Sequence, residues 1–190
     1  VYCIYCGLTY FIPFLNKIYM LPATAVGMYG IVNQYGLKMI GGPVGGFMSV
    51  KVHKSAAKHI RVGFVVCTVA MAVFLMIPHE ALGQKGMWML GAVCTLTFGA
   101  IVFTMRAVFF APMDEVKVPR EITGAAMSMA SLIIYLPNTF AYVMYGNFLD
   151  RFPGMTGFRI VFSVMIGWAV VGVGVSTFLI RRIKKHQKNA

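Results

Sequence analysis

Six long apolar stretches, separated by short segments that carry most of the charged residues, dominate this chain of 190 residues. They lie at about 1–16, 22–50, 60–78, 87–112, 122–147 and 158–180. A helix needs about 20 apolar residues to cross the hydrocarbon core of a bilayer. None of the joining segments is long enough for a further domain. The pattern therefore predicts an all-α membrane protein with six transmembrane helices and the lipid bilayer as its main partner.

The composition excludes the common soluble classes. Hydrophobic residues make up 59% of the chain and charged residues 12%, which is typical neither of a soluble domain nor of a disordered one. All four cysteines lie inside apolar stretches, where a thiol behaves as a small hydrophobic group. The four histidines are expected in loops. We therefore predict no metal site and no cofactor; the cysteines are Cys3, Cys6, Cys67 and Cys94, and the histidines are His53, His59, His79 and His186.

The basic residues are distributed unevenly over the joining segments. If the C-terminus is cytoplasmic, eleven lysines and arginines fall inside and four outside. That asymmetry follows the positive-inside rule, so the net charge of +12 needs no nucleic acid to explain it. We expect a multi-pass protein of the plasma membrane (the cell inner membrane). The inside residues are Lys51, Lys54, Lys58, Arg61, Lys117, Arg120, Arg181, Arg182, Lys184, Lys185 and Lys188, and the outside ones are Lys17, Lys85, Arg151 and Arg159.

Four of the six stretches carry polar or small residues at intervals of three or four. Such a stripe is typical of a helix that lines an aqueous path, although small residues at this spacing also let helices pack closely. The third and sixth stretches lack one and are expected to be peripheral. The stripes are Tyr2, Tyr5, Thr9 and Asn16; Gly30, Gln34, Lys38, Gly41 and Gly45, with Asn33 beside them; Gly91, Thr95, Gly99 and Arg106; and Gly124, Ser128, Ser131, Tyr135, Asn138 and Tyr142.

Away from their ends, the apolar stretches contain two cations, Lys38 and Arg106, and no carboxylate. A cation in the membrane is costly unless it meets water, a carboxylate or a ligand. Lys38 is therefore the expected charge contact for a small anionic substrate. Asn33, Gln34, Tyr135, Asn138 and Tyr142 would hydrogen-bond or stack on the rest of it. Arg106 is a further candidate for contact with the substrate. Alternatively, it could pair with an acidic residue of a loop, such as Glu115.

Glycine and proline residues occur at several positions inside these stretches. The segment GGPVGG holds two G-x-x-x-G spacings, Gly41 with Gly45 and Gly42 with Gly46, which favour close helix contact. Pro13, Pro43 and Pro137 each remove a backbone donor, so we expect kinks there.

The whole chain resembles the C-terminal half of a transporter of the major facilitator superfamily. In that family the first, second, fourth and fifth helices of a half line the cavity. GGFMSVKVHKS resembles the cytoplasmic signature G-x-x-x-D-R/K-x-G-R/K: Gly46, Lys51 and Lys54 match it, and Val50 and His53 depart from it.

This resemblance implies a half bundle of two inverted three-helix repeats, a missing N-terminal half as partner, and transport by alternating access. It also implies a cytoplasmic gate that contains Lys51, Lys54, Glu115 and Arg120.

Other functions fit the sequence less well. An intramembrane protease needs a histidine beside its nucleophile, and we expect none within a span. A metal hydrolase would show a ligand cluster such as H-E-x-x-H, which is absent from the sequence. We therefore expect no enzyme activity. The sequence predicts transmembrane transport of a small polar, anionic solute, an organic anion, sugar or sugar derivative. A channel, or a structural six-span membrane protein without transport activity, remains the alternative.

Overall fold

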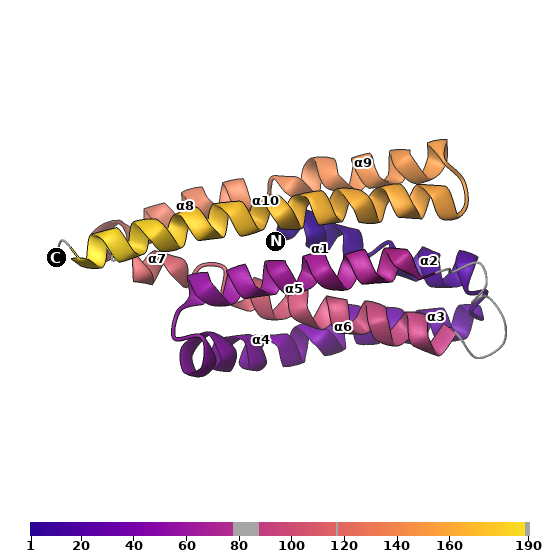
Figure 1. Ribbon diagram of the computed structural model, residues 1–190, viewed down its shortest axis with the longest axis horizontal. Coiled ribbons are helices and arrows are strands. Elements are labelled where there is room, and N and C mark those ends of the chain that lie inside the picture. The colour runs from indigo at the N-terminus through magenta and orange to yellow at the C-terminus, as the bar shows by residue number, and fades with distance from the viewer. Residues whose placement is uncertain (78–87, 117, 189–190) are drawn as a thin grey trace.

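The computed structural model describes residues 1–77, 88–116 and 118–188, and these residues are helical apart from short connections. The helices run roughly along one long axis (Figure 1). The all-α prediction is confirmed. In chain order the elements are α1 (Tyr2–Leu8), α2 (Phe11–Ile18), α3 (Ala23–Ile31), the π-helical η1 (Val32–Gly36), α4 (Leu37–Phe47), the π-helical η2 (Met48–Val52), α5 (Ala56–Met76), α6 (Trp88–Ala107), α7 (Pro112–Glu115), α8 (Arg120–Tyr135), α9 (Pro137–Arg151) and α10 (Met155–Lys188).

Some sequence predictions fall on positions that the structure does not describe. The expected end of the third span at 78 and the expected start of the fourth at 87 are among them. So are His79, Lys85 and Lys117, and the side chains of Arg120, His186 and Lys188.

Four helical segments are long and apolar enough to cross a membrane: Ala56–Met76, Trp88–Ala107, Glu121–Arg151 and Met155–Lys185. They correspond to the third to sixth expected spans, so the chain is a multi-pass membrane protein. The first two expected spans consist of shorter elements. Length and hydropathy therefore identify four spans rather than the six that we expected.

The first expected span is divided where proline interrupts the hydrogen-bond ladder. Helix α1 ends at Leu8, and α2 begins at Phe11, two residues before Pro13. Proline has no N–H to donate to the carbonyl of Thr9, and its ring would clash with that carbonyl in a continuous helix. Pro137 acts in the same way between α8 and α9. Pro43, by contrast, lies inside α4 without ending it.

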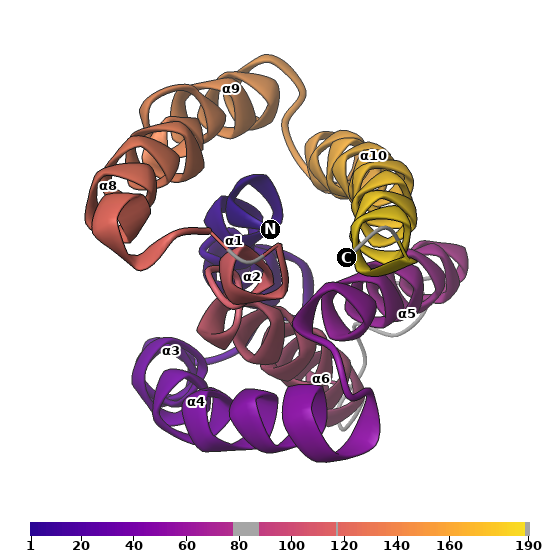
Figure 2. The same ribbon diagram turned by 90° about the vertical axis from the view of Figure 1, so that its left-hand side faces the viewer.

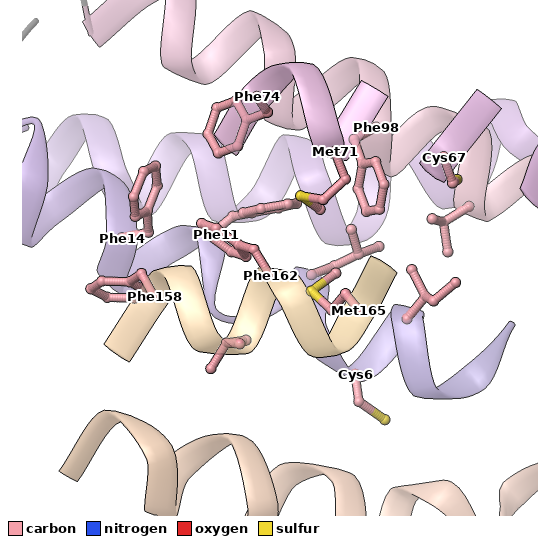
Figure 3. Packing of buried hydrophobic residues seen from close by; sticks show 14 of the residues in the cluster. Cys6, Phe11, Phe14, Cys67, Met71, Phe74, Phe98, Phe158, Phe162 and Met165 are labelled. Atoms are coloured by element: carbon pink, nitrogen blue, oxygen red, sulfur yellow. The ribbon is translucent and has the colours of Figure 1, made fainter. Parts of the chain in front are cut away.

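The aromatic core lies where α2, α5 and α10 meet, and α1 and α2 occupy the middle of the bundle (Figure 2). Phe14 is central, with its ring centroid 5.6 Å from that of Phe74 and 5.2 Å from those of Phe158 and Phe162. Figure 3 shows these rings facing one another across the interface, with Phe11 beside them. Edge-to-face contacts of this kind supply the van der Waals packing that holds helices together in a membrane.

Glycine lets α4 approach α6 closely. A Cβ atom added at Gly41 would lie 2.8 Å from Cβ of Phe103, and one at Gly45 would lie 2.5 Å from the carbonyl oxygen of Thr104. Gly42 and Gly46, on another face of α4, have nothing within 4 Å. The prediction of close helix contact is therefore confirmed for Gly41 and Gly45. No other helix approaches Gly42 and Gly46 closely among the described residues.

The third and sixth expected spans, α5 and α10, pack along each other. Gly172 of α10 receives the ring of Phe64 from α5. Both helices bury residues in the core, whereas none of the side chains from Glu121 to Tyr135 of α8 is buried. The helices without a polar stripe are thus tightly paired, and α8, which has one, is the more exposed.

The basic connecting segments gather at one end of the bundle. The end of the α4–η2 segment, α7 and the C-terminus lie close to one another in Figure 1, at the end opposite to the α2–α3 and α9–α10 connections. The end of α4, α7 and the C-terminal end of α10 thus share one end of the bundle, and the side of the membrane that this end faces stays a prediction.

Candidate functional site

Arg106, in the last turn of α6, turns toward α1. Its Nη2 atom donates a hydrogen bond of 2.7 Å to the hydroxyl oxygen of Tyr2. Its Cζ atom lies 4.1 Å from the ring centroid of Tyr5 and 5.0 Å from that of Tyr2. The guanidinium is thus held by two aromatic faces and one hydroxyl group, all of them uncharged, in an arrangement typical of cation–π contact.

The charge of Arg106 is not balanced by a carboxylate within the described part of the chain. Its Nη1 atom is buried and has no hydrogen-bond partner there. The alternative that we considered from the sequence, an ion pair with Glu115, does not form, because the Glu115 carboxylate binds the start of α5. A partly buried cation without a counterion is costly. The position of Arg106 therefore favours an anion.

The expected site residues of the fifth span lie against α1 beside Arg106. The ring of Tyr135 meets that of Tyr2 edge-on, with centroids 4.8 Å apart. Asn138 accepts a hydrogen bond at Oδ1 from the Cys6 thiol over 3.2 Å. Tyr142 is partly buried, and its backbone carbonyl accepts a hydrogen bond of 2.8 Å from the Tyr10 hydroxyl. Tyr135 is thus joined to Arg106 through Tyr2, whereas Asn138 contacts α1 at Cys6 and Tyr142 contacts Tyr10, between α1 and α2.

The expected site residues of the second span lie elsewhere. Lys38 is exposed on α4 and forms no hydrogen bond or ion pair with a described residue. Gln34 is partly buried. Asn33 is completely buried in η1, and neither polar atom of its side chain has a partner among the described residues. Its Oδ1 atom lies 2.8 Å from where a Cβ atom of Gly99 would be, so Gly99 makes room for the amide.

The residues predicted for the gate are partly brought together. The Ser55 hydroxyl donates to Oε2 of Glu115 over 2.9 Å, and the backbone N–H groups of Ala56 and Ala57 donate to its Oε1. Glu115 thereby caps α5 and ties α7 to it. Lys54 lines a cavity with Glu115.

Lys51 is not joined to this contact, and the side chain of Arg120 lies outside the described part of the chain. The Lys51 ammonium lies 5.5 Å from the ring centroid of Phe47 instead. Arg120 is the first residue of α8.

Sequence reasoning left Tyr2, Tyr5 and Cys6 out of the site. Tyr2 and Tyr5 belong to the polar stripe of the first span, so the signal was present, but their contact with Arg106 joins positions about 100 residues apart. Cys6 was taken as a packing residue. Figure 3 shows it pointing away from the aromatic cluster, and its thiol reaches Asn138.

The prediction that the histidines lie in loops was wrong for two of them. His59 lies inside α5, where it is buried, and its Nδ1 atom is 3.2 Å from Nδ1 of His53. His186 also lies in a helix, α10. His59 lies in the basic segment KVHKSAAKHIR, which we expected to be a loop, but α5 already begins at Ala56, after Ser55. Among the residues that the structure describes, no three His, Cys, Asp or Glu side chains gather in a way that could hold a metal ion.

The chain is similar to two inner membrane proteins of Escherichia coli K12. It is 50% identical over 188 residues to inner membrane protein YihN, a match that covers 99% of this chain and 44% of YihN. It is 27% identical over 183 residues to inner membrane protein YqcE, covering 95% of this chain and 41% of YqcE. The chain thus spans less than half the length of these relatives. No protein-family model and no solved structure matches it.

These matches support an inner membrane location and correct two expectations. The chain aligns over nearly its whole length with proteins described only as inner membrane proteins, and no family model assigns it to the major facilitator superfamily. The identification as the C-terminal half of such a transporter is therefore withdrawn. The expected partner, a missing N-terminal half, rested on that resemblance and is withdrawn with it. The part of the prediction that still holds is that the chain belongs to a multi-pass protein of the inner membrane.

Proposed function

We propose that the protein carries a small polar, anionic solute across the membrane by alternating access, with Arg106 as its main charge contact. The observation that carries this proposal is the guanidinium beside Tyr2 and Tyr5, which has a buried nitrogen without a partner in the described residues and no carboxylate nearby. A carboxylate or phosphate of the solute would neutralise this charge on binding and leave it unpaired on release.

The neighbours of Arg106 suit a solute with hydroxyl groups. Tyr135 is 44% exposed and presents both a ring and a phenol group next to Tyr2. Asn138 and Tyr142 follow on the next turns of the same stripe. Tyrosine rings stack on sugar faces, and amide groups hydrogen-bond hydroxyls. An organic anion, a sugar or a sugar derivative is therefore the class of solute that we propose.

Arg106 replaces Lys38 as the preferred charge contact in this proposal. Lys38 is exposed on α4, whereas Arg106 is held in one geometry by three groups on α1. A long lysine side chain on an exposed helix face can extend its ammonium toward the membrane interface without any ligand. We propose a secondary role for Lys38, Asn33 and Gln34, as groups that the solute meets in another state of the protein.

We also propose that six segments cross the membrane. The residues from Ala23 to Val52 are helical throughout, and at about 1.5 Å per residue they extend about 45 Å, more than the about 30 Å of a hydrocarbon core. Helices α1 and α2 would provide the remaining crossing. In this arrangement the basic end of the bundle faces the cytoplasm, as the positive-inside rule requires.

Alternating access needs contacts that open, and the basic end of the bundle offers one. Glu115 joins α7 to the start of α5 through Ser55, Ala56 and Ala57. We propose that this contact, with Lys54 beside it, holds one state of the carrier closed. The π-helical segments η1 and η2 are where the α4 helix could change its winding, because π-turns have strained and less regular hydrogen bonding.

Uptake into vesicles that contain the purified protein tests the proposal. A panel of small carboxylates, sugar phosphates and neutral sugars is screened first for saturable uptake and counterflow. Arg106→Ala should reduce uptake of the anionic substrate by about a hundredfold, because losing a desolvated charge contact costs about 3 kcal/mol. Lys38→Ala is the comparison variant, and it should retain most of the activity.

Folding is checked separately for each variant by its melting temperature in detergent. Saturable uptake that survives in a folded Arg106→Ala protein would remove Arg106 from the site. A linear, non-saturating conductance would instead identify a channel, and no flux with any anion would refute transport.

A further inference from the structure

A small cavity at the basic end of the bundle has the features of a binding site. It measures about 160 Å³ and opens between the start of α5, the helix α7 and the last turns of α10. It is independent of the Arg106 site. The lining residues are Lys54, Ser55, Lys58, Glu115, Ile180, Ile183 and Lys184.

The charges around this cavity are positive and unpaired. Three lysines and one glutamate line it, which leaves a net charge of +2 (three minus one). The oxygens of Glu115 already accept hydrogen bonds from Ser55 and from the N–H groups that begin α5. Neither Lys54, Lys58 nor Lys184 forms an ion pair with a residue that the structure describes. The three ammonium groups are therefore available to an anion from outside the chain.

One wall of the cavity is apolar. Ile180 and Ile183 of α10 are each 7% exposed and pack with Ala57 of α5 in a small hydrophobic cluster of their own. A free inorganic anion gains nothing from such a wall. A molecule with a charged group and an attached hydrocarbon part would use both the lysines and the isoleucines.

The position of the cavity matches the membrane interface. It lies where two candidate spans, Ala56–Met76 and Met155–Lys185, begin and end. At this depth the phosphate groups of lipids meet the first methylene groups of their chains. Basic pockets between transmembrane helices are suited to anionic lipid headgroups.

The backbone of Lys54 adds a local observation. Its φ angle of 51° lies in the left-handed region, which side chains other than glycine and asparagine rarely adopt. The turn that ends η2 therefore holds Lys54 in an unfavourable conformation at the rim of the cavity. Strained residues of this kind concentrate at ligand sites.

We propose that this cavity binds the phosphodiester headgroup of an anionic phospholipid. Lys54, Lys58 and Lys184 contact the phosphate oxygens, and Ile180 and Ile183 contact the glycerol and the first part of the acyl chains. The bound lipid would bridge α5 and α10 at the end where Glu115 joins α7 to α5.

A pair of double variants tests the proposal. Lys58→Gln with Lys184→Gln removes two charges from the cavity. Lys51→Gln with Lys185→Gln removes two charges from the same end of the protein, but neither residue lines the cavity. Lipid binding is measured by native mass spectrometry and by the shift of the melting temperature in micelles, with phosphatidylglycerol, phosphatidylcholine or inorganic phosphate added.

We expect phosphatidylglycerol to bind and to raise the melting temperature of the unmodified protein, and phosphatidylcholine to do so far less. The cavity variant should bind phosphatidylglycerol about thirtyfold more weakly, because it loses two lysines at about 1 kcal/mol each. The control variant should differ from the unmodified protein by less than about twofold.

Three outcomes would overturn the proposal. Equal weakening in both variants would indicate a diffuse basic surface rather than a cavity. Competition by inorganic phosphate as effective as by the lipid would identify a site for free phosphate. Equal binding of phosphatidylglycerol and phosphatidylcholine would show that the cavity does not select anionic lipids. Melting temperatures without lipid show whether each variant is folded.

Discussion

Helix α4 is pressed against its neighbour, whereas helix α8 stands apart, although both carry small and polar residues at intervals of three or four. On α4, Gly41 and Gly45 are buried against the backbone of α6. On α8, Gly124 is exposed with nothing within 4 Å of its missing Cβ, and Ser128 donates to the carbonyl of Gly124 in its own helix. The two helices lie on different sides of α1 (Figure 2).

The difference lies in what each residue type can do without a partner. A serine hydroxyl in a helix satisfies itself by donating to the carbonyl four residues earlier, as Ser128 and Ser131 do. A glycine has no side chain to satisfy, and its contribution depends on another backbone coming close. A stripe of glycines that meets a backbone therefore stabilises the bundle, while a stripe of serines leaves its helix free to face lipid, water or another surface.

The largest expected effect follows from the packed helix. Gly45→Leu places a side chain where Thr104 of α6 already lies, because a Cβ atom there would be 2.5 Å from the Thr104 carbonyl oxygen. The two helices must move apart, and we expect the free energy of unfolding to fall by about 3 kcal/mol. Thermal or denaturant unfolding in detergent measures this change.

Gly46→Leu is the matched control, since nothing lies within 4 Å of the Cβ position at Gly46. It adds the same side chain, one residue along the same helix. Equal destabilisation by both substitutions would contradict the difference between the faces of α4.

The second prediction concerns how α9, and α8 through it, is attached to the bundle. The buried Tyr145 hydroxyl donates a hydrogen bond of 3.0 Å to the carbonyl oxygen of Cys3 on α1. Tyr145→Phe should lower the free energy of unfolding by about 1 kcal/mol, because it removes one buried hydrogen bond between α9 and α1. Tyr35→Phe, at a residue that is 72% exposed, should have no measurable effect. Similar losses in the two variants would contradict a specific contribution from this hydrogen bond.

The helical class and several interruptions of the helices followed from local sequence. Apolar runs predict helices because a membrane leaves no other way to satisfy the backbone. Pro13 and Pro137 predict breaks because each lacks a donor at a fixed position. The π-helical segments η1 and η2 had no such local signal, since their residues are compatible with ordinary α-helix.

The candidate site was less predictable because it depends on the rotation of each helix. The charge of Arg106 is obvious in the sequence, but its partners Tyr2 and Tyr5 come from α1, about 100 residues earlier. Lys38 is exposed although it shares a stripe with Gly41 and Gly45, which lie against α6. Which stripe meets a neighbour is decided by packing between helices, which sequence periodicity alone does not specify.

The smallest change in stability is expected for a substitution on the exposed helix α8, and this substitution tests the difference between α8 and α4 most directly. Ser128→Ala removes a hydroxyl whose hydrogen bond returns to Gly124 in the same helix, so the free energy of unfolding should change by no more than about 0.5 kcal/mol.

Cysteine labelling compares the exposure of the two helices. Ser128→Cys should react readily with a small thiol reagent in the folded protein, and Gly41→Cys should not, because Gly41 is buried against Phe103. A polar reagent that labels Ser128→Cys would show that α8 faces water, and labelling only by a lipid-soluble reagent would show that it faces lipid. Protection of both cysteines would mean that α8 is covered as closely as α4, and the contrast between the two helices would be lost.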